Sequence, residues 1–172
     1  MIRKGDWVTF PAEVYDRVMA HARAVEEMNR RKRVRSKKIS KKESDIAIDV
    51  RGFLGEFAFA MMTGLPFDSS VTPRSKKDGT DDGDFTLQSG LTIDVKARAR
   101  RNYALIVPEG TPCIVDIYVS IAVEGNSAWF QGAYDAPSVH EIHPRPWPGR
   151  TPNHIVEVHN LKELDELGVF LG

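Results

Sequence analysis

The sequence predicts a protein of the mixed α/β (α+β) class. Two long segments with apolar residues at three- or four-residue spacing come first, and strand-like segments rich in β-branched residues dominate from residue 84 onward. At 172 residues the chain is long enough for one domain with a substantial core. We therefore expect a single globular unit, with an N-terminal helix and basic arm over residues 1–43 and a core over residues 44–172.

Two helices are expected before the first strand. The first runs from Pro11 to about Asn29, because proline is accepted in a first helical turn and apolar residues recur every three or four positions. Ser40-Lys41-Lys42-Glu43 matches a capping box and starts the second helix, which continues to about Met62 and ends at Gly64-Leu65-Pro66. The apolar stripe of the second helix consists of Ile46, Val50, Phe53, Leu54, Phe57 and Met61.

A β-hairpin is expected over residues 84–98. If Gln88-Ser89-Gly90 is a three-residue turn, Leu87 lies opposite Leu91 and Asp84 lies opposite Asp94. The second strand alternates between an apolar face, which begins at Leu91 and Ile93, and a polar face. The polar face carries Thr92, Asp94, Lys96 and Arg98.

This hairpin brings two carboxylates and an amine together. Facing residues on antiparallel strands have Cβ atoms about 5 Å apart, and like charges at that separation destabilise a sheet. A divalent cation between Asp84 and Asp94 would offset the repulsion, and two carboxylates leave most of the octahedral shell of Mg²⁺ to water and substrate phosphate. Lys96 lies roughly 7 Å along the strand from Asp94 and could orient a water molecule. The alternative is an exposed hairpin whose charges face solvent.

A third acid lies on the second helix. Gly52, Glu56 and Ala60 share a row at four-residue spacing beside the apolar stripe. Small residues around Glu56 would let the helix approach a sheet closely, so Glu56 could point at the same metal region. The alternative is a glutamate on an exposed helix surface.

The rest of the chain is predicted to be mainly strands. The segment from His143 to His154 contains four prolines and is expected to form an irregular loop. The other elements expected downstream are strands at Tyr103–Val107, Cys113–Val123, Ala128–Tyr134 and Ile155–His159, a short helix at Ala136–Ile142 and a final helix from Asn160 to about Gly168.

Net charge is zero, but the charges are segregated along the chain. Nine of the thirteen residues from 30 to 42 are basic and none is acidic, which is typical of a segment that contacts a polyanion. These are Arg30, Arg31, Lys32, Arg33, Arg35, Lys37, Lys38, Lys41 and Lys42. A shorter basic run follows the hairpin at Arg98, Arg100 and Arg101. Two basic tracts around an acidic metal site suit a phosphate-backbone substrate; the alternative for the long tract is a solvated loop or a localisation-like tract.

The cysteine, histidine and hydropathy patterns argue against an internal disulfide, a zinc site and a membrane-spanning segment. Cys113 is the single cysteine and lies in an apolar run, so we expect a buried thiol and no internal disulfide. Zinc binding is not predicted for the histidines at 140, 143, 154 and 159, which lack cysteine partners and a helical H-E-x-x-H pattern. No run approaches the ~20 apolar residues that span a bilayer, and the amino terminus lacks an apolar signal core, so we expect no membrane partner and a cytoplasmic location.

Taken together, Glu56, Asp84, Asp94 and Lys96 make the chain resemble the PD-(D/E)XK nuclease superfamily. That superfamily has the restriction-endonuclease-like fold, an αβββαβ core with a central mixed sheet flanked by helices. The resemblance runs from about Ser44 to Gly168. The matching segments are Gly52-Phe53-Leu54-Gly55-Glu56-Phe57 for the helix acid, Gly83-Asp84 for the middle aspartate and Asp94-Val95-Lys96 for the terminal tripeptide. Small phage-type and resolvase-like nucleases of this superfamily are similar in size.

The resemblance implies roles for these residues. Asp84 and Asp94 would ligate Mg²⁺ with help from the Val95 carbonyl, and Mn²⁺ could substitute. Lys96 would assist the attacking water, and Glu56 would support this ion or a second one. Gly83 stands where the superfamily has proline, so Asp81 or Asp82 could replace Asp84, although the hairpin register favours Asp84.

The predicted function is therefore a Mg²⁺-dependent deoxyribonuclease, most simply an endonuclease, that hydrolyses phosphodiester bonds of DNA with a metal-activated water. A homodimer is compatible with double-strand cutting, and the location would be the host-cell cytoplasm if the protein is viral. Two alternatives remain open: a non-catalytic nucleic-acid-binding module of the same fold, and a nuclease that is active only within a larger complex.

Overall fold

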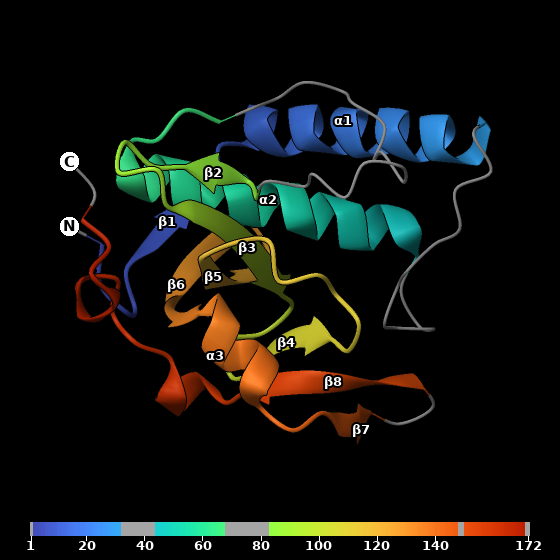
Figure 1. Ribbon diagram of the computed structural model, residues 1–172. Helices are drawn as coiled ribbons and strands as arrows, with labels where there is room; N and C mark the ends of the chain where they lie inside the picture. The colour runs from blue at the N-terminus through green and yellow to red at the C-terminus, as the bar shows by residue number, and fades with distance from the viewer. Residues whose placement is uncertain (1, 32–43, 68–82, 148–149, 171–172) are drawn as a thin grey trace.

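The computed structural model describes residues 2–31, 44–67, 83–147 and 150–170. Helices and strands are mixed along the chain, so the α+β class is confirmed (Figure 1). The helices are α1 (Ala12–Arg31), α2 (Asp45–Thr63) and α3 (Ala136–Glu141), with 3₁₀ turns η1 (Val158–Asn160) and η2 (Asp165–Leu167). The strands are β1 (Trp7–Thr9), β2 (Phe85–Thr86), β3 (Thr92–Arg98), β4 (Leu105–Pro108), β5 (Ile117–Glu124), β6 (Ser127–Asp135), β7 (Arg145–Trp147) and β8 (Arg150–Val156).

The larger sheet described has the strand order β1-β6-β5-β3-β2. Its strands are antiparallel except that β3 and β5 run parallel, so the sheet is mixed. The connection from β3 to the parallel β5 passes through β4, which belongs to a second sheet. Strand β1 was not predicted; it is short and pairs with the edge of β6, so it carries little periodic signal of its own.

Helix α2 packs directly on the larger sheet, and α1 forms the layer outside it (Figure 1). Both helices were predicted within a few residues. The described helix α2 begins at Asp45, where the Ser44 hydroxyl accepts a hydrogen bond from Ala47 N at 3.1 Å, so its N-cap is Ser44 and the predicted box at Ser40 lies outside the described residues. As predicted, the helix ends at Gly64, which has the left-handed conformation typical of a helix end.

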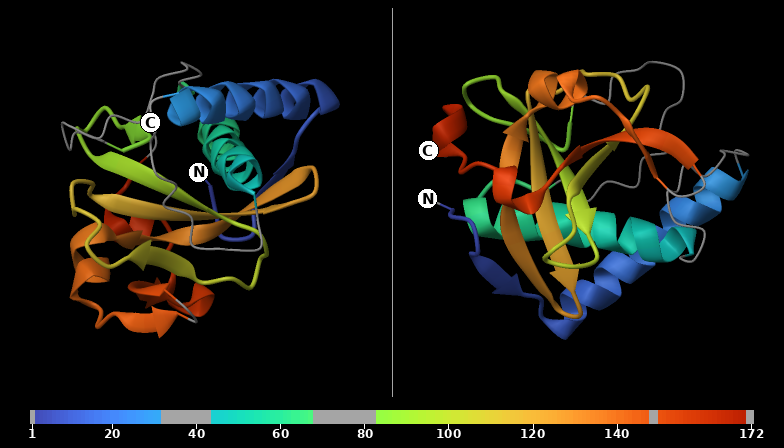
Figure 2. Two further views of the ribbon diagram at one scale, coloured as in Figure 1. Left: turned by 90° about the vertical axis from the view of Figure 1, so that its right-hand side faces the viewer. Right: turned by 90° about the horizontal axis from the view of Figure 1, so that it is seen from below.

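A second sheet, with the order β4-β8-β7, lies on the opposite side of the larger sheet from α2 (Figure 2). The prediction of an irregular loop over His143–His154 was wrong, because β7 and the start of β8 lie there. Pro152 is tolerated in β8 because it lies just outside the part of the strand that pairs with β4. The β4–β8 ladder ends where Pro108 pairs with Asn153. The Pro152 carbonyl still accepts a hydrogen bond from Glu109 N at 2.9 Å.

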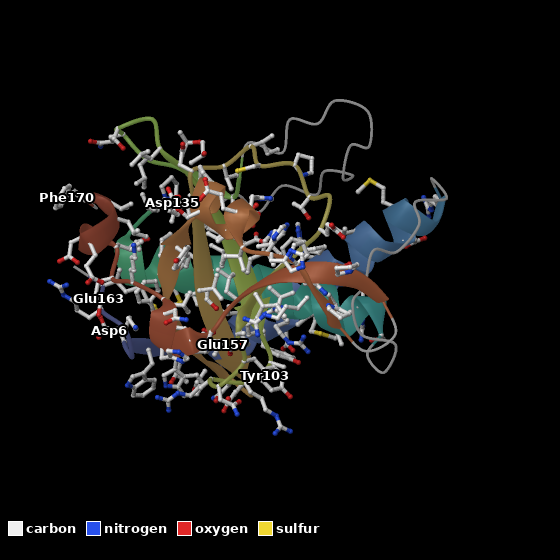
Figure 3. The ribbon with its side chains drawn as sticks, turned by 60° about the horizontal axis from the view of Figure 1, so that its bottom comes forward. Asp6, Tyr103, Asp135, Glu157, Glu163 and Phe170 are labelled. Carbon is white, nitrogen blue, oxygen red and sulfur yellow. The ribbon has the colours of Figure 1, made fainter. Side chains whose placement is uncertain are left out.

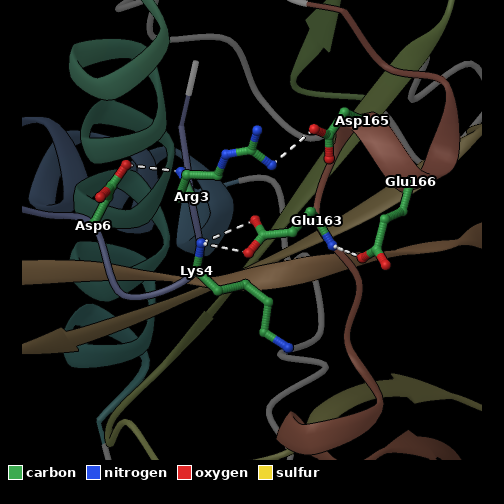
Figure 4. Close-up of polar contacts among 6 residues, drawn as sticks. All are labelled: Arg3, Lys4, Asp6, Glu163, Asp165 and Glu166. Atoms are coloured by element: carbon green, nitrogen blue, oxygen red, sulfur yellow. Dashed lines mark hydrogen bonds and ion pairs between the residues drawn. The ribbon is translucent and has the colours of Figure 1, made fainter.

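The predicted final helix was also wrong, since only the turns η1 and η2 form there. Backbone hydrogen bonds join Lys162 to Ala133 of β6 at 2.9 Å in both directions, which holds this segment extended. Its carboxylates bind the N-terminal segment: Glu163 accepts from Lys4 N, and Asp165 pairs with Arg3 at 2.7 Å (Figure 4). These contacts outweigh a weak local helix signal.

The main core lies between α2 and the larger sheet and includes Phe59, Ile93 and Val119. Phe10, Val18 and Ala22 are buried in the same core, so α1 and the segment before it share one core with α2 and the larger sheet. A second core lies between the two sheets and α3. The burial expected for Cys113 was wrong: its side chain is exposed, because β5 begins only at Ile117. Within the described residues, no helix is long and apolar enough to cross a membrane.

Candidate active site

The hairpin has the register that the sequence predicted. Phe85 pairs with Ile93 and Thr86 with Thr92, and Leu87 N donates to Leu91 O at 2.8 Å across the turn. The side chains of Ile93 and Val95 are buried towards α2, which leaves Asp94 and Lys96 on the other face of β3.

Asp84 lies at the outer edge of β3, where the β2 ladder ends. Its backbone N–H donates to Ile93 O at 2.7 Å, and its Oδ2 accepts from Val95 N at 2.6 Å. Since the backbone N–H and C=O of one strand residue point to the same edge, the Val95 carbonyl faces this side too. The Asp84 carboxylate therefore sits beside the backbone of Asp94 and Val95.

Gly83, directly before Asp84, has a backbone conformation that proline could not adopt. Its φ of +86° is inaccessible to proline, whose ring holds φ near −65°. A Cβ at this position would lie 2.7 Å from Ile93 O, so even alanine would collide with β3. The glycine lets the chain turn sharply into β2 and sets the backbone direction of Asp84.

Asp94 and Lys96 form an ion pair, with 2.5 Å between Asp94 Oδ2 and Lys96 Nζ. About a quarter of each side chain is exposed, 22% and 27% respectively, so both are partly accessible to solvent. The Lys96 ammonium also lies 5.5 Å from the centroid of the Tyr118 ring. Tyr118 pairs with Asp94 in the parallel β3–β5 register and is buried, so its ring supports the lysine from the neighbouring strand.

A polar chain extends from Tyr118 to two histidines. The Tyr118 hydroxyl and His140 Nε2 are 3.1 Å apart, and the rings of His140 and His154 are 5.2 Å apart. The His154 Nδ1 donates to Ile142 O at 2.7 Å. Burial, with the nearby Asp94 charge and Cys113 thiol, raises the pKa of Tyr118, while burial and His154 lower the pKa of His140. Both groups therefore favour their neutral forms. Sequence reasoning missed Tyr118, whose only signal is its position opposite Asp94.

Glu56 lies on the flank of α2 that is nearest to β2. Gly55 faces β3, where a Cβ would lie 2.8 Å from Ala97 Cβ, and the Phe59 ring contacts the Phe85 ring of β2 at 5.3 Å. On a helix, Glu56 falls beside both positions and on the side of the β2 edge. Its side chain is partly buried.

The carboxylates do not form a three-ligand cluster. Within the described residues, no group of three or more His, Cys, Asp or Glu side chains is close enough to hold a metal ion. The candidate oxygen donors are the Asp84 carboxylate, which accepts from Val95 N, the Asp94 carboxylate on the same strand as Val95, and the Val95 carbonyl. These are hard ligands of the kind that Mg²⁺ prefers, and Mg²⁺ usually takes only one or two protein carboxylates. The donor set therefore fits Mg²⁺ chemically.

The predicted basic residues have different environments. Arg100 and Arg101 are exposed in the loop after β3. Arg98 is turned inward: its Nε donates to Ala104 O at 2.8 Å, and its Nη2 is buried without a hydrogen-bond partner among the described residues. Burial, with the nearby Arg51, lowers the pKa of Arg98 to about 10. In the long tract, Arg31 ends α1 and pairs with Glu27 at 2.5 Å, while residues 32–42 lie outside the described residues.

Comparison with known families adds one finding. A family described as "Family of unknown function (DUF5843)" matches residues 7–136. The chain belongs to the DUF5843 family. The match begins at the first residue of β1 and ends at the first residue of α3, so it covers the larger sheet, α1, α2 and the candidate site. No curated protein and no solved structure matches the chain.

Proposed function

We propose that this DUF5843 protein is a Mg²⁺-dependent nuclease that hydrolyses phosphodiester bonds of DNA. One observation carries the proposal: the Asp84 carboxylate binds Val95 N at 2.6 Å beside the Asp94–Lys96 pair, so two carboxylates, one backbone carbonyl and one ammonium converge on a single strand. Like charges on facing strand positions destabilise a sheet, so their placement here favours a functional site over an exposed hairpin without a role.

Each residue has a part in the proposed reaction. Asp84 and Asp94, with the Val95 carbonyl, would hold Mg²⁺, which when bound supplies Lewis-acid polarisation of the phosphate and a more acidic water. Lys96 orients the attacking water and stabilises negative charge on the phosphate. Tyr118 positions Lys96 through its ring, 5.5 Å from the ammonium. Glu56 would support the bound ion from α2.

The restriction-endonuclease-like fold is part of this proposal. The succession α2, β2 and β3, with β5 parallel to β3, supports it. The full order differs from αβββαβ, because five strands instead of three separate α2 from α3 among the described elements. The function therefore rests on the site chemistry rather than on the fold. A cytoplasmic location and a homodimer that cuts both strands belong to the same proposal.

Cleavage by the purified chain tests the proposal directly. Supercoiled plasmid, linear duplex, single strands and a branched junction are incubated with Mg²⁺, Mn²⁺ or EDTA. We expect metal-dependent cutting that falls at least 100-fold in Asp94→Asn and in Lys96→Ala, since charge stabilisation and proton transfer each contribute about that much. Asp165→Asn is the control, because Asp165 pairs with Arg3 away from the site. Full cleavage by both site variants would overturn the proposal.

A second candidate is a nucleic-acid-binding module without catalysis. The observation that favours it is that the described acids do not form a three-ligand cluster. Tight, salt-sensitive DNA binding without cutting of any substrate would support this module. Metal binding at Asp94, measured by calorimetry with Mn²⁺ and lost in Asp94→Asn, would instead support a nuclease that needs a larger complex.

A further inference from the structure

Aromatic and arginine side chains gather at one end of the larger sheet. Trp7 of β1 and Trp129 of β6 are directly paired in the antiparallel register; Trp7 is 60% exposed and Trp129 is half-buried. Their strand neighbours Val8, Ala128 and Phe130 pack into the core under α2. Both tryptophans therefore lie on the face away from α2, which is also the face of Asp94 and Lys96.

Two arginines from the loop after β3 lie over the rings of Trp129 and Tyr103. The Arg101 guanidinium is 5.0 Å from the Trp129 ring centroid, and the Arg100 guanidinium is 5.9 Å from the ring of Tyr103, which is 46% exposed. Figure 3 shows Tyr103 at the outer edge of the molecule. Such cation–π pairs contribute little to the stability of the fold but orient each arginine against an aromatic surface.

Buried polar groups hold the backbone of this loop. Gln131 is 5% exposed and lies at an irregularity of the β5–β6 ladder, which directs its side chain towards the loop. Its Nε2 donates to Arg101 O at 2.7 Å and to Tyr103 O at 3.4 Å. Arg98 donates to Ala104 O at 2.8 Å, and Glu124 accepts from Arg101 N at 2.8 Å. The loop backbone is thus fixed while its charged and aromatic side chains stay outside.

We propose that Trp7, Trp129, Arg101, Arg100 and Tyr103 form a stacking platform for the unpaired bases of single-stranded DNA. Aromatic faces accept any base, and arginines contact both the bases and the phosphates, which is the chemistry of sequence-tolerant single-strand binding. Two carboxylates near the platform are engaged in backbone hydrogen bonds: Glu124 accepts from Arg101 N, and Asp6 accepts from Arg3 N at 2.7 Å.

The platform and the candidate active site lie on the same face of the larger sheet. β3 leads from Lys96 through the inward-turned Arg98 to the loop of Arg100 and Arg101. The choice of substrate rests on the proposed nuclease function: if the protein cuts DNA, the platform makes a single strand, or an unpaired stretch at a branch, the preferred substrate. The binding of single strands to the platform does not depend on that function.

Binding in EDTA tests the platform separately from cleavage. The probe is a fluorescently labelled oligo(dT) of about 20 nucleotides, followed by anisotropy, with an unlabelled duplex of equal length as competitor. We expect Trp7→Ala to weaken single-strand binding by roughly five-fold or more, since stacking contributes about 1–3 kcal/mol per base. Arg101→Gln lowers the salt slope by about 0.7, the loss of one phosphate contact.

A matched control separates stacking from general apolarity. Phe170 is 69% exposed and lies apart from Tyr103 (Figure 3), so Phe170→Ala should leave binding unchanged. The platform is overturned if oligo(dT) does not bind, if Trp7→Ala weakens duplex and single-strand binding equally, or if Trp7→Ala dissolves a dimer without changing oligo(dT) affinity. The platform and the nuclease site can also be separated. If the platform variants lose oligo(dT) binding while Lys96→Ala still cuts DNA at the full rate, the proposed nuclease site is refuted and the platform is supported.

Discussion

The contact between α2 and β3 makes a quantitative prediction about stability. Gly55 is buried, and a Cβ there would lie 2.8 Å from Ala97 Cβ and 3.6 Å from Val95 Cγ1. Gly52 lies in the same helix, but a Cβ at that position would have no atom within 4 Å. Alanine raises helix propensity by about 1 kcal/mol at either position. The difference between the two variants therefore isolates the steric cost at Gly55.

We expect Gly52→Ala to stabilise the protein by up to about 1 kcal/mol. Gly55→Ala should be about 1–3 kcal/mol less stable than Gly52→Ala, the usual cost of an extra methyl in a packed core. For a chain of this length the difference corresponds to roughly 2–12 °C in Tm. Urea unfolding followed by circular dichroism measures both variants against the natural chain, and equal slopes check that unfolding remains two-state.

A double variant sharpens the test. Ala97→Gly removes the methyl that the new Cβ would meet, so Gly55→Ala should cost less in the Ala97→Gly background than alone. If Gly55→Ala is as stable as Gly52→Ala within about 0.5 kcal/mol, the close approach of α2 to β3 is refuted. The packing of α2 against β3, the strand that carries Asp94 and Lys96, would then need a different explanation.

Three further predictions concern the cap, the site turn and pH. Ser44→Ala should destabilise the protein by about 1 kcal/mol in urea unfolding, because the Ala47 N–H loses its 3.1 Å partner. Gly83→Ala should cost at least about 1 kcal/mol, since φ is +86° and the Cβ would meet Ile93 O, and it should lower cleavage by displacing Asp84; unchanged stability would contradict that backbone conformation. Burial and His154 lower the pKa of His140 in the folded protein. Below about pH 6.5 the imidazole is therefore protonated more readily in the unfolded chain than in the folded protein. The free energy of unfolding should fall as the solution is acidified from that pH towards the lower native pKa. Tm measured from pH 7.5 to 5 should therefore fall less in His140→Gln, and equal falls would contradict this.

Local patterns in the sequence determined the hairpin and the helices. The turn at Gln88-Ser89-Gly90 and the strict alternation after Leu91 were sufficient to predict the hairpin register, because a hairpin joins residues that are close in the chain. The hydrogen bond from Val95 N to Asp84 came from the structure. Helices α1 and α2 were predictable for the same reason, since their period is contained within one segment.

Only the tertiary structure decided which distant segments meet. Tyr118 supports Lys96 because β5 runs parallel to β3, and Trp7 meets Trp129 because β1 pairs with β6. The proline-rich segment forms β7 and the start of β8 because β4 pairs with β8 and β8 pairs with β7. The last segment is extended because Lys162 is hydrogen-bonded to Ala133. Such contacts depend on hydrogen bonds and packing between residues far apart in sequence, which outweigh the weak local preferences of short segments.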